Sequence, residues 1–403
     1  VGSEMCIRDS FKLPFHPLLP DDPNLSLQRG RIHEFFRYTK PQRKLLEELE
    51  LIIIDEISMV RADIIDAVDR ILRVYSRNLR EPFGGKQLLL VGDVFQLEPV
   101  VKGDEREILN RFYPTPYFFS ARVFNQIDLV SIELEKVYRQ TDKVFVSVLD
   151  HIRSNTAGAT DLQLLNTRYG TDIEENEEDM YITLATRRDN VDYINDRKLA
   201  ELPGDAVTFR GEVTGDFPES SLPTSRELVL KPGAQVIFIK NDFDRRWVNG
   251  TIGVIAGIDE EEETIYVITD DGKECDVKRE SWRNIRYRYN EKTKEIEEEV
   301  LGSFTQYPIR LAWAITVHKS QGLTFSRVVI DFTGGVFAGG QAYVALSRCT
   351  SLDGIQLKKP IHRADIFVRP EIVNFAGRFN DRQAIDKALK QAQADVQYAA
   401  AAR

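Results

Sequence analysis

The sequence predicts an α/β protein with two parallel sheets, the second interrupted by a small antiparallel β-barrel. Two apolar runs that end in carboxylates, Leu51–Asp55 and Gln87–Asp93, enclose a segment of helical periodicity, which is typical of a doubly wound sheet. A similar alternation of strands and helices resumes farther along the chain. The stretch from Leu228 to Phe304 instead carries short alternating strands with Asn-Gly and Asp-Gly turns, which favour antiparallel hairpins.

The composition is that of an ordinary globular chain: of 403 residues, 42% are hydrophobic and 29% are charged. No apolar run approaches the ~18 residues of a membrane-spanning helix. Cys6, Cys275 and Cys349 lack paired spacing, which argues against disulfides or a zinc site and favours a reducing compartment such as the bacterial cytoplasm. Because the net charge is −10, a nucleic-acid site would have to be a local basic surface on an acidic body.

The first ten residues, VGSEMCIRDS, have no periodicity, no turn chemistry and no apolar signal segment. The string resembles the translated end of a transposase-type sequencing adapter. We therefore expect Val1–Ser10 to be adapter-derived or disordered rather than native, and the natural reading frame to continue upstream of Phe11.

Helices and strands alternate through the first part of the chain. Phe11–Asn24 is rich in proline and aromatic residues and is expected to form an ordered loop. It is followed by a predicted helix (Pro41–Glu50), strand (Leu51–Asp55), helix (Asp63–Tyr75) and strand (Gln87–Asp93). Because both strands are continuous apolar runs, we expect their sheet to be buried on both faces.

The second part repeats this alternation around the predicted barrel. Before the barrel, the expected elements are the strand Val130–Leu134, the helix Val144–Ile152, the strand Tyr181–Ala185 and the helix Asn190–Leu199. Two dipeptides, Asn249-Gly250 and Asp271-Gly272, predict hairpin turns within it. After it come the apolar segment PIRLAWAI, the strand Val328–Asp331, the helix Gln341–Leu346 and the helical tail Asp381–Arg403.

Polar side chains follow both strands of the first sheet. Asp55 and Glu56 end the first strand, at the edge where an open α/β sheet meets its ligand. An Asp there can hold Mg²⁺ through water, and the adjacent Glu can orient or deprotonate an attacking water. Asp93 and Gln96 follow the second strand, and a glutamine there can sense a phosphate. The structural alternative is a pair of acids that cap a helix and an ordinary exit from a strand.

Two arginines are candidates for phosphate recognition: Arg139 in VYRQTD and Arg348 in YVALSR. The planar, permanently charged guanidinium suits the phosphates of a nucleotide held between two lobes. For a single arginine, a surface salt bridge is the commoner explanation.

The segment Leu311–Asp331 is the most informative stretch of the chain. Thr316, His318, Lys319 and Ser320 offer hydrogen-bond donors to the phosphates of a nucleic-acid backbone, and Gln321-Gly322 can reach a nucleotide. No second ligand stands at metal spacing from His318, so this histidine is not expected to bind a metal. Trp247 and Tyr343 could stack on bases, although core packing explains both better.

These motifs, DEISM, GDVFQLEPV, VYRQTD, NGTIG, LAWAITVHKSQGLT and YVALSR, resemble in order and spacing those of the PIF-type, RecD-like superfamily-one DNA helicases. The resemblance covers about Phe11 to Val373 and is jointly specific. It implies ATP and Mg²⁺ as cofactors, with Asp55 on Mg²⁺, Glu56 as catalytic base, Gln96 as γ-phosphate sensor, and Arg139 and Arg348 as arginine fingers. It further implies contacts to nucleotide from Asp93, Gln321 and Gly322, and to DNA from Thr316, His318, Lys319, Ser320, Asn249 and Gly250.

The resemblance implies two RecA-like motor domains of the P-loop NTPase type and an inserted SH3-like barrel. The expected layout is 11–129 for the rest of the first domain, 130–227 and 306–375 for the second, 228–305 for the barrel, and 376–403 for a terminal helix. The family moves 5′ to 3′ on single-stranded DNA and unwinds duplexes. We therefore expect single-stranded DNA and duplex junctions as partners of a monomer.

The sequence departs from the family pattern at two places. Glu98 stands where the family usually has proline, near the path of the DNA. No G-x-x-x-x-G-K-[ST] occurs in the 403 residues, although that loop and its lysine are needed to hold ATP. We therefore expect this chain alone to be inactive as an ATPase. The alternatives are a non-catalytic nucleic-acid-binding module and another superfamily-one activity, such as an RNA helicase or the motor subunit of a nuclease complex.

Overall fold

The computed structural model describes residues 7–8, 10–14, 16–22, 25, 32, 35–101, 103–171, 180–290 and 295–401. The chain forms two compact units: the first joins Val1–Val137 to Val368–Arg403, and the second is Tyr138–Phe367. Residues 1–6 and 9 of the leading segment, and residues 15, 23 and 24 of the predicted loop, lie outside the described residues, whereas Ile7 and Arg8 are buried. No described helix is long and apolar enough to cross a membrane.

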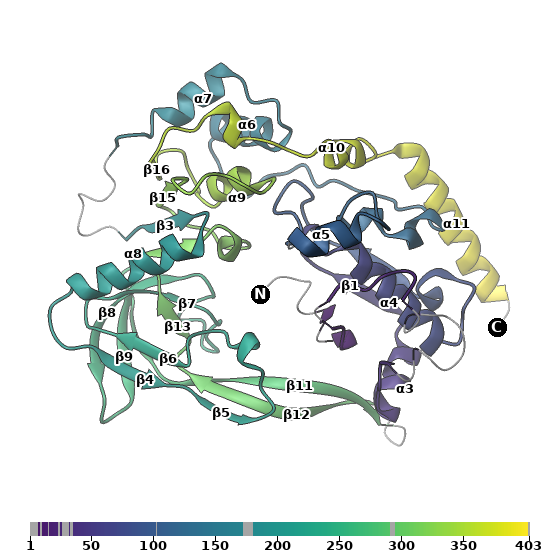
Figure 1. Cartoon of the computed structure of the whole chain (residues 1–403), viewed down its shortest axis with the longest axis horizontal. Helices are drawn as coiled ribbons and strands as arrows, with labels where there is room; N and C mark the ends of the chain where they lie inside the picture. Colours follow the sequence, from purple (N-terminus) through teal and green to yellow (C-terminus); the bar gives the residue numbers. More distant parts are fainter. Residues whose placement is uncertain are drawn as a thin grey trace. The chain divides into compact units, whose positions relative to one another are not determined.

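The first unit has the predicted order of helix, strand, helix and strand: α3 (Lys40–Glu48), β1 (Leu51–Ile54), α4 (Ala62–Tyr75) and β2 (Gln87–Leu90) (Figure 1). Pro41 lies in the first turn of α3, where its missing N–H would have had no helical partner. β1 and β2 pair in parallel, with Leu51 opposite Gln87 and Ile54 opposite Leu90. The predicted parallel pairing is confirmed, and α5 (Gly103–Leu109) follows β2 along the chain.

The expectation that β1 and β2 are buried on both faces is wrong. Leu51 and Ile53 on β1 are 43% and 60% exposed, and Leu89 on β2 is 47% exposed. In the described part of the chain this sheet consists of these two strands alone. The apolar side chains of one face therefore lack the covering layer that a parallel sheet normally has.

The predicted strand Val130–Leu134 does not form in the described structure. The segment is extended, but its backbone is held by Asn380, whose N–H donates to the Ser131 carbonyl at 2.9 Å and whose Oδ1 accepts the Glu133 N–H at 3.0 Å. The C-terminal helices α10 (Pro370–Ala376) and α11 (Arg382–Ala401) accordingly belong to the first unit. The boundary that we expected after residue 129 lies instead after Val137, because these contacts hold the segment to the first unit.

The second unit contains a four-stranded parallel sheet in the order β14 (Ala314–Thr316), β3 (Ile182–Ala185), β15 (Val328–Asp331) and β16 (Ile355–Leu357). All four residues of β3 are buried. Figure 1 shows α8 (Arg188–Glu201) on one side of this sheet and α6 (Lys143–Arg153) and α9 (Gln341–Ser347) on the other. α7 (Ala159–Asn166) follows α6 along the chain. The α/β class predicted for this part of the chain is confirmed.

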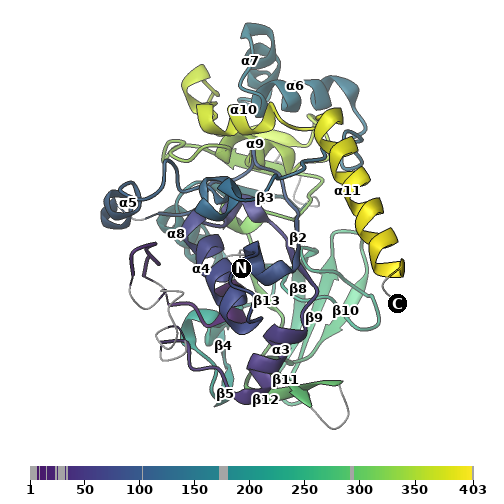
Figure 2. The same ribbon diagram turned by 90° about the vertical axis from the view of Figure 1, so that its right-hand side faces the viewer.

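An antiparallel β-rich insertion separates β3 and α8 from β14. Its five-stranded sheet runs in the order β10 (Glu274–Val277), β9 (Thr264–Thr269), β8 (Ile252–Asp259), β7 (Gln235–Phe238) and β13 (Ile309–Leu311). Figure 2 shows β8, β9 and β10 side by side. The long hairpin of β11 (Glu280–Asn290) and β12 (Glu295–Gln306) adds β5 (Glu212–Gly215), and β4 (Val207–Arg210) pairs with β6 (Glu227–Leu230). Whether the insertion is SH3-like stays a prediction.

The insertion differs from its predicted limits of 228 and 305. It begins at β4 and ends at β13, because β5 pairs with β12 and β13 pairs with β7. The segment PIRLAWAI is consequently shared by two sheets: Ile309–Leu311 belongs to the insertion, and Ala314–Thr316 pairs with β3. Trp247 is 5% exposed and lies in the core of the insertion, as predicted.

Both predicted dipeptides form turns, but only Asp271-Gly272 lies in a short connection between two strands. Gly272 has φ +78° and lies in the short connection between β9 and β10. Asn249-Gly250 instead ends a longer connection, residues 239–251, between β7 and β8. Position 250 still favours glycine, because its φ is +100°. The N–H of Gly250 donates to the Phe238 carbonyl at 2.8 Å.

Candidate functional site

The first cluster of candidate residues follows β1 in the first unit. Asp55 is exposed, and its Oδ1 accepts the N–H of Glu56 at 2.8 Å. Glu56 has φ 50° and ψ 44°, a left-handed conformation that costs a non-glycine residue roughly 1 kcal/mol or more. It leads directly into the short 3₁₀ helix Ile57–Met59. Such strain is often kept where a side chain must be aimed, so it supports a functional role for this turn.

The end of β2 approaches this turn closely. The N–H of Ile57 donates to the Val91 carbonyl at 3.0 Å. Gly92 has φ +153°, and a Cβ on it would lie 2.9 Å from the Ile57 nitrogen. Only glycine allows this approach, which brings the segment after β2 against Glu56 and Ile57.

Asp93 and Gln96 form a small hydrogen-bonded turn after Gly92. Asp93 accepts the N–H of Phe95 at 3.0 Å through Oδ1 and the side-chain amide of Gln96 at 3.4 Å through Oδ2. The backbone N–H of Gln96 also donates to the Asp93 carbonyl at 3.0 Å. Asp93 therefore positions Gln96, which suits a glutamine that senses a ligand.

Glu98, the departure from the family pattern, has partners within the first unit. Its Oε2 accepts the hydroxyl of Tyr117 at 2.7 Å and lies 3.6 Å from Nε of Arg369. Burial, together with the charge of Glu98, raises the pKa of Tyr117, so this phenol stays protonated and donates. The carboxylate thus links the segment after β2 to the residue that precedes α10.

The metal that the resemblance implies was tested against the carboxylates present. No group of three or more His, Cys, Asp or Glu in the described part of the chain could hold a metal ion. Mg²⁺, however, commonly binds through one or two carboxylates, waters and the phosphates of a nucleotide. The exposed Asp55 fits that mode, whereas a metal site made by protein ligands alone does not fit.

In the second unit, Arg139 and Arg348 meet at one loop. Nε of Arg139 donates to Oγ1 of Thr324 at 2.8 Å, and Nη1 of Arg348 donates to the Leu323 carbonyl at 3.3 Å. Arg348 is only 1% exposed, and its Nε donates to the Val344 carbonyl at 3.0 Å. Both arginines are thus held by groups of the same loop, Leu323 and Thr324. Arg348 would have to leave these carbonyls to reach a phosphate.

Two residues of this cluster were missed in the sequence. Gln140 is buried, and its amide donates to the carbonyls of Ser347 and Cys349 at 2.9 Å each, which ties the VYRQTD segment to the end of α9. Thr324 holds Arg139. Gln140 lies in VYRQTD beside Arg139, and Thr324 ends the HKSQGLT motif, so membership of a motif is the signal that the sequence offers.

The DNA-contacting candidates lie where β14 ends and the 3₁₀ helix His318–Ser320 begins. Lys319 is exposed, and its N–H donates to Oγ1 of Thr316 at 3.3 Å. Burial lowers the pKa of His318, so this ring is neutral at pH 7. Ser320 is fully buried and its hydroxyl donates to the Val317 carbonyl at 2.7 Å, so its expected place near the DNA track stays a prediction.

Asn249, Gly250 and Gly322 line one cavity of about 320 Å³ in the second unit. A Cβ on Gly250 would lie 2.9 Å from Leu323 Cδ2, so the two loops touch there. The N–H of Asn249 donates to Oδ1 of Asn241 at 2.7 Å. The structure thus brings the NGTIG loop of the insertion to the loop that also carries Thr324.

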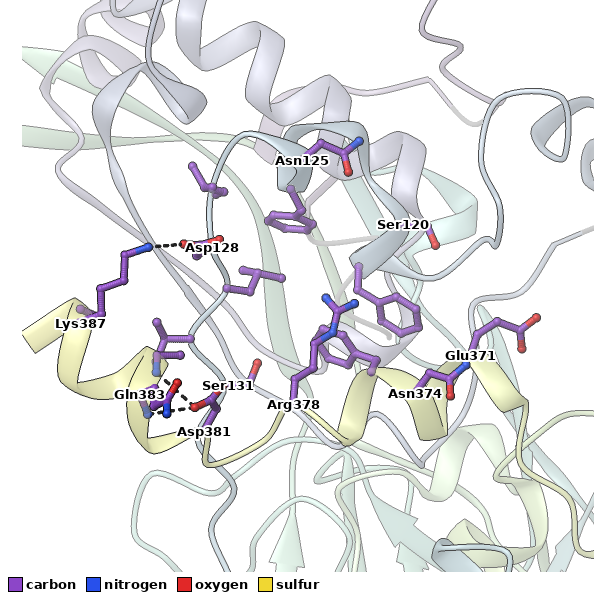
Figure 3. Close-up of a pocket in the computed structure, with 18 of the residues that line it drawn as sticks. Ser120, Asn125, Asp128, Ser131, Glu371, Asn374, Arg378, Asp381, Gln383 and Lys387 are labelled. Carbon is purple, nitrogen blue, oxygen red and sulfur yellow. Dashed lines mark hydrogen bonds and ion pairs between the residues drawn. The ribbon is translucent and has the colours of Figure 1, made fainter.

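A groove of about 950 Å³ in the first unit lies away from these residues (Figure 3). Its walls are the segment around Ser120–Ser131 and the helices α10 and α11, and Lys387 pairs with Asp128 across it at 3.1 Å. Figure 3 shows Arg378 extending into it. None of the candidate residues lines this groove.

Known proteins resemble the chain along most of its length. Residues 33–160 match the family model described as PIF1-like helicase. The ATP-dependent DNA helicase Pif1 of Campylobacter jejuni is 33% identical over 329 residues, which cover 78% of this chain and 70% of that protein. The human ATP-dependent DNA helicase PIF1 is 35% identical over 314 residues, which cover 76% of this chain and 45% of that protein.

Solved structures of Pif1 helicases also resemble this chain. A Pif1 from Bacteroides sp in complex with ADP-AlF4 has a TM-score of 0.80 at 38% identity, over 92% of this chain and 82% of that chain. Bacteroides Pif1 bound to single-stranded DNA has a TM-score of 0.65 at 38% identity, with the same coverage.

Proposed function

Because the chain belongs to the PIF1-like helicase family, we propose that it carries the motor core of an ATP-dependent DNA helicase. Its relatives are named as such helicases, and the Bacteroides protein was solved both with ADP-AlF4 and with single-stranded DNA. The structural observation that carries the proposal is the edge of the first sheet. Asp55-Glu56 and Asp93–Gln96 leave neighbouring parallel strands there, and Gly92 lets the two turns touch.

We assign the nucleotide chemistry of the first unit to these side chains. Asp55 would hold Mg²⁺, Glu56 would accept a proton from the attacking water, and Gln96, positioned by Asp93, would sense the γ-phosphate. Bound Mg²⁺ would neutralise charge on the phosphates. The strained backbone at Glu56 fixes the direction from which its carboxylate works.

In the second unit, Arg139 and Arg348 are the phosphate-binding cations, and Gln321-Gly322 precedes the Leu323-Thr324 pair that holds both. Thr316, His318 and Lys319, with Asn249 and Gly250 of the insertion, provide the track for single-stranded DNA. Movement along it is 5′ to 3′, as in the family. The free, buried Cys275 and Cys349 fit a reducing compartment, and we propose the bacterial cytoplasm or nucleoid as the location. A monomer is proposed from the resemblance to the family alone.

One observation favours a second candidate, a nucleic-acid-binding module without turnover. The 403 residues contain no G-x-x-x-x-G-K-[ST]. Gly85-Lys86 is followed by glutamine and Gly272-Lys273 by glutamate, and the Lys86 amine donates to the carbonyls of Glu47 and Leu49. Without a phosphate-binding loop and its lysine, ATP is held poorly whatever the rest of the site does.

The test measures binding of single-stranded DNA and ATP turnover on the same preparation. We expect DNA binding that weakens with salt, and turnover near background with or without DNA. Glu56→Gln is the matched control, since it keeps the shape of the side chain and removes its basicity. Turnover that disappears in Glu56→Gln would contradict the expected inactivity of this chain while supporting the catalytic base. Failure to bind single-stranded DNA even at low salt would contradict the proposed function itself.

A further inference from the structure

One cation of the second unit, Arg310, has no role in the site described so far. It lies on β13, opposite Ile237 of β7. Its neighbours Ile309 and Leu311 pack into the core of the insertion. Because successive side chains of a strand point to opposite faces, Arg310 faces away from that core.

The guanidinium of Arg310 is poorly satisfied by the protein. Its Nε is buried without a hydrogen-bond partner, and no described residue forms an ion pair with this side chain. Burial alone lowers the pKa of Arg310, with no carboxylate to oppose it. Arg310 as a whole is half-buried, so this partly desolvated cation keeps an unmet hydrogen bond at Nε and stays within reach of a ligand.

The charges around Arg310 are also mostly positive. Although Lys319 is exposed as a residue, partial loss of hydration lowers the pKa of its amine, and the nearby charges of Arg310 and Arg188 lower it further. The one acid that acts in the other direction on Lys319 is Asp192, which lies 3.5 Å from the guanidinium of Arg188 on the same helix. Asp192 thus offsets charge on Arg188 and Lys319, whereas no acid of the described residues acts on Arg310.

We propose that Arg310, together with Lys319, binds a backbone phosphate of single-stranded DNA. The planar guanidinium can give two parallel hydrogen bonds to a phosphate, and this contact would supply the anion that the protein does not. The assignment rests on the proposed function, because Lys319 belongs to the segment assigned to the DNA track. It makes β13, a strand of the insertion, part of that track.

The two roles open to Arg310 predict opposite effects on stability. If Arg310 served only the fold, its replacement would lower the melting temperature and leave DNA binding unchanged. If Arg310 binds a DNA phosphate, Arg310→Met removes a half-buried charge that has no ion-pair partner. It should therefore keep or raise the melting temperature while it weakens DNA binding.

The experiment measures the dissociation constant for a fluorescent single-stranded oligonucleotide over a series of salt concentrations. Arg310→Met should weaken binding about fivefold to tenfold at low salt and reduce the slope against log salt by about 0.7, the value for one phosphate contact on a single strand. Arg310→Lys should keep the slope, because the charge remains, and lose only part of the affinity. The control is Arg197→Met, which removes the same charge from α8, where Glu201 already pairs with Arg197 at 2.7 Å.

Three outcomes decide the question. The proposal is overturned if Arg310→Met, folded by its melting curve, binds with the wild-type constant and slope, or if Arg197→Met weakens binding equally. If Arg310→Met does not fold, a loss of slope in Arg310→Lys overturns it, and a retained slope with weaker binding supports it. If the wild-type chain does not bind the oligonucleotide at all, the proposed function is contradicted. The proposal for Arg310, which depends on it, is then contradicted as well.

Discussion

The two parallel sheets of this chain have similar sequence signatures but different surroundings. β1 and β2 of the first unit are apolar strands with Ile53 and Leu89 largely exposed, whereas Leu184 on β3 and Ile330 on β15 of the second unit are 0% and 1% exposed. The second sheet has four strands with helices on both sides, and the first has two strands in the described part of the chain. An apolar run thus specifies a strand, but its burial depends on what else packs there.

The units can be followed separately in solution. All three tryptophans, Trp247, Trp282 and Trp313, lie in the second unit. Tryptophan fluorescence therefore reports unfolding of the second unit, while circular dichroism in the far ultraviolet reports both. Each prediction below uses this difference.

The largest effect should come from matched leucine truncations in the two sheets. Leu184→Ala in β3 should lower the free energy of unfolding of the second unit by about 2–5 kcal/mol, because it leaves a cavity in a closed core. Leu89→Ala in β2, where the side chain is 47% exposed, should cost under about 1 kcal/mol. Urea unfolding followed by tryptophan fluorescence and circular dichroism measures both, and equal costs would mean that the two sheets are equally buried in solution.

The second prediction compares two glutamines. Gln140 in the second unit is buried and satisfies two backbone carbonyls, so Gln140→Ala should cost about 2–3 kcal/mol. Gln96 in the first unit is only half-buried, and its hydrogen bond to Asp93 is long, at 3.4 Å, so Gln96→Ala should cost less, under about 1 kcal/mol. The midpoint of the fluorescence transition should move for Gln140→Ala and stay in place for Gln96→Ala. The reverse order would show that Gln140 is not the anchor between VYRQTD and α9.

The third prediction compares two glycines of left-handed geometry. Gly92→Ala should cost about 2 kcal/mol in the first unit, since it adds a contact at 2.9 Å to an unfavourable φ of +153°. Gly322→Ala should cost only about 1 kcal/mol, because φ is +77° but nothing lies within 4 Å of the added Cβ. Circular dichroism should detect the first change without a matching shift in fluorescence. If the two cost the same, the close approach of β2 to Ile57 contributes nothing.

The smallest effect should be a pH dependence in the second unit. The side-chain hydrogen bonds from Arg246 hold the pKa of Asp242 below its usual range. A lowered pKa favours the charged form in the folded state, so this contribution is complete above about pH 4 and is lost as the pH falls through the lowered value. Asp242→Asn should therefore cost about 1 kcal/mol at neutral pH and almost nothing at strongly acidic pH.

The first unit offers the opposite sign as a control. Burial raises the pKa of Asp66, against the hydrogen bonds from Val123, Arg122 and Tyr113. A raised pKa means that this carboxylate opposes folding at neutral pH, and the penalty fades as the pH falls through the raised value. Urea unfolding followed by tryptophan fluorescence at several pH values measures this. The wild type should lose stability at acidic pH, and Asp242→Asn should not. If Asp242→Asn loses stability at acidic pH as the wild type does, Asp242 is not the group that causes this loss.

Local patterns determined much of this protein in advance. The helices α3, α4, α8 and α9, the strands β1, β2, β3 and β15, and the parallel class of both sheets follow from apolar periodicity and from turn residues, which act over a few neighbouring positions. The order of the motifs identified the family for the same reason, since each motif is contiguous in the chain. Val130–Leu134 was misassigned because its partner, Asn380, lies far along the sequence.

Only the tertiary structure decided which of these residues are exposed and which are paired with other groups of the protein. It left Leu51 and Ile53 exposed, buried Ser320 and Arg348, divided PIRLAWAI between two sheets, and left Arg310 without an acid. Exposure and pairing depend on segments that meet only after folding, so a contiguous pattern cannot encode them alone. The sequence by itself therefore determined the class of motor and the residue types at its candidate site, and packing determined which of those side chains are exposed and which are already held by the protein.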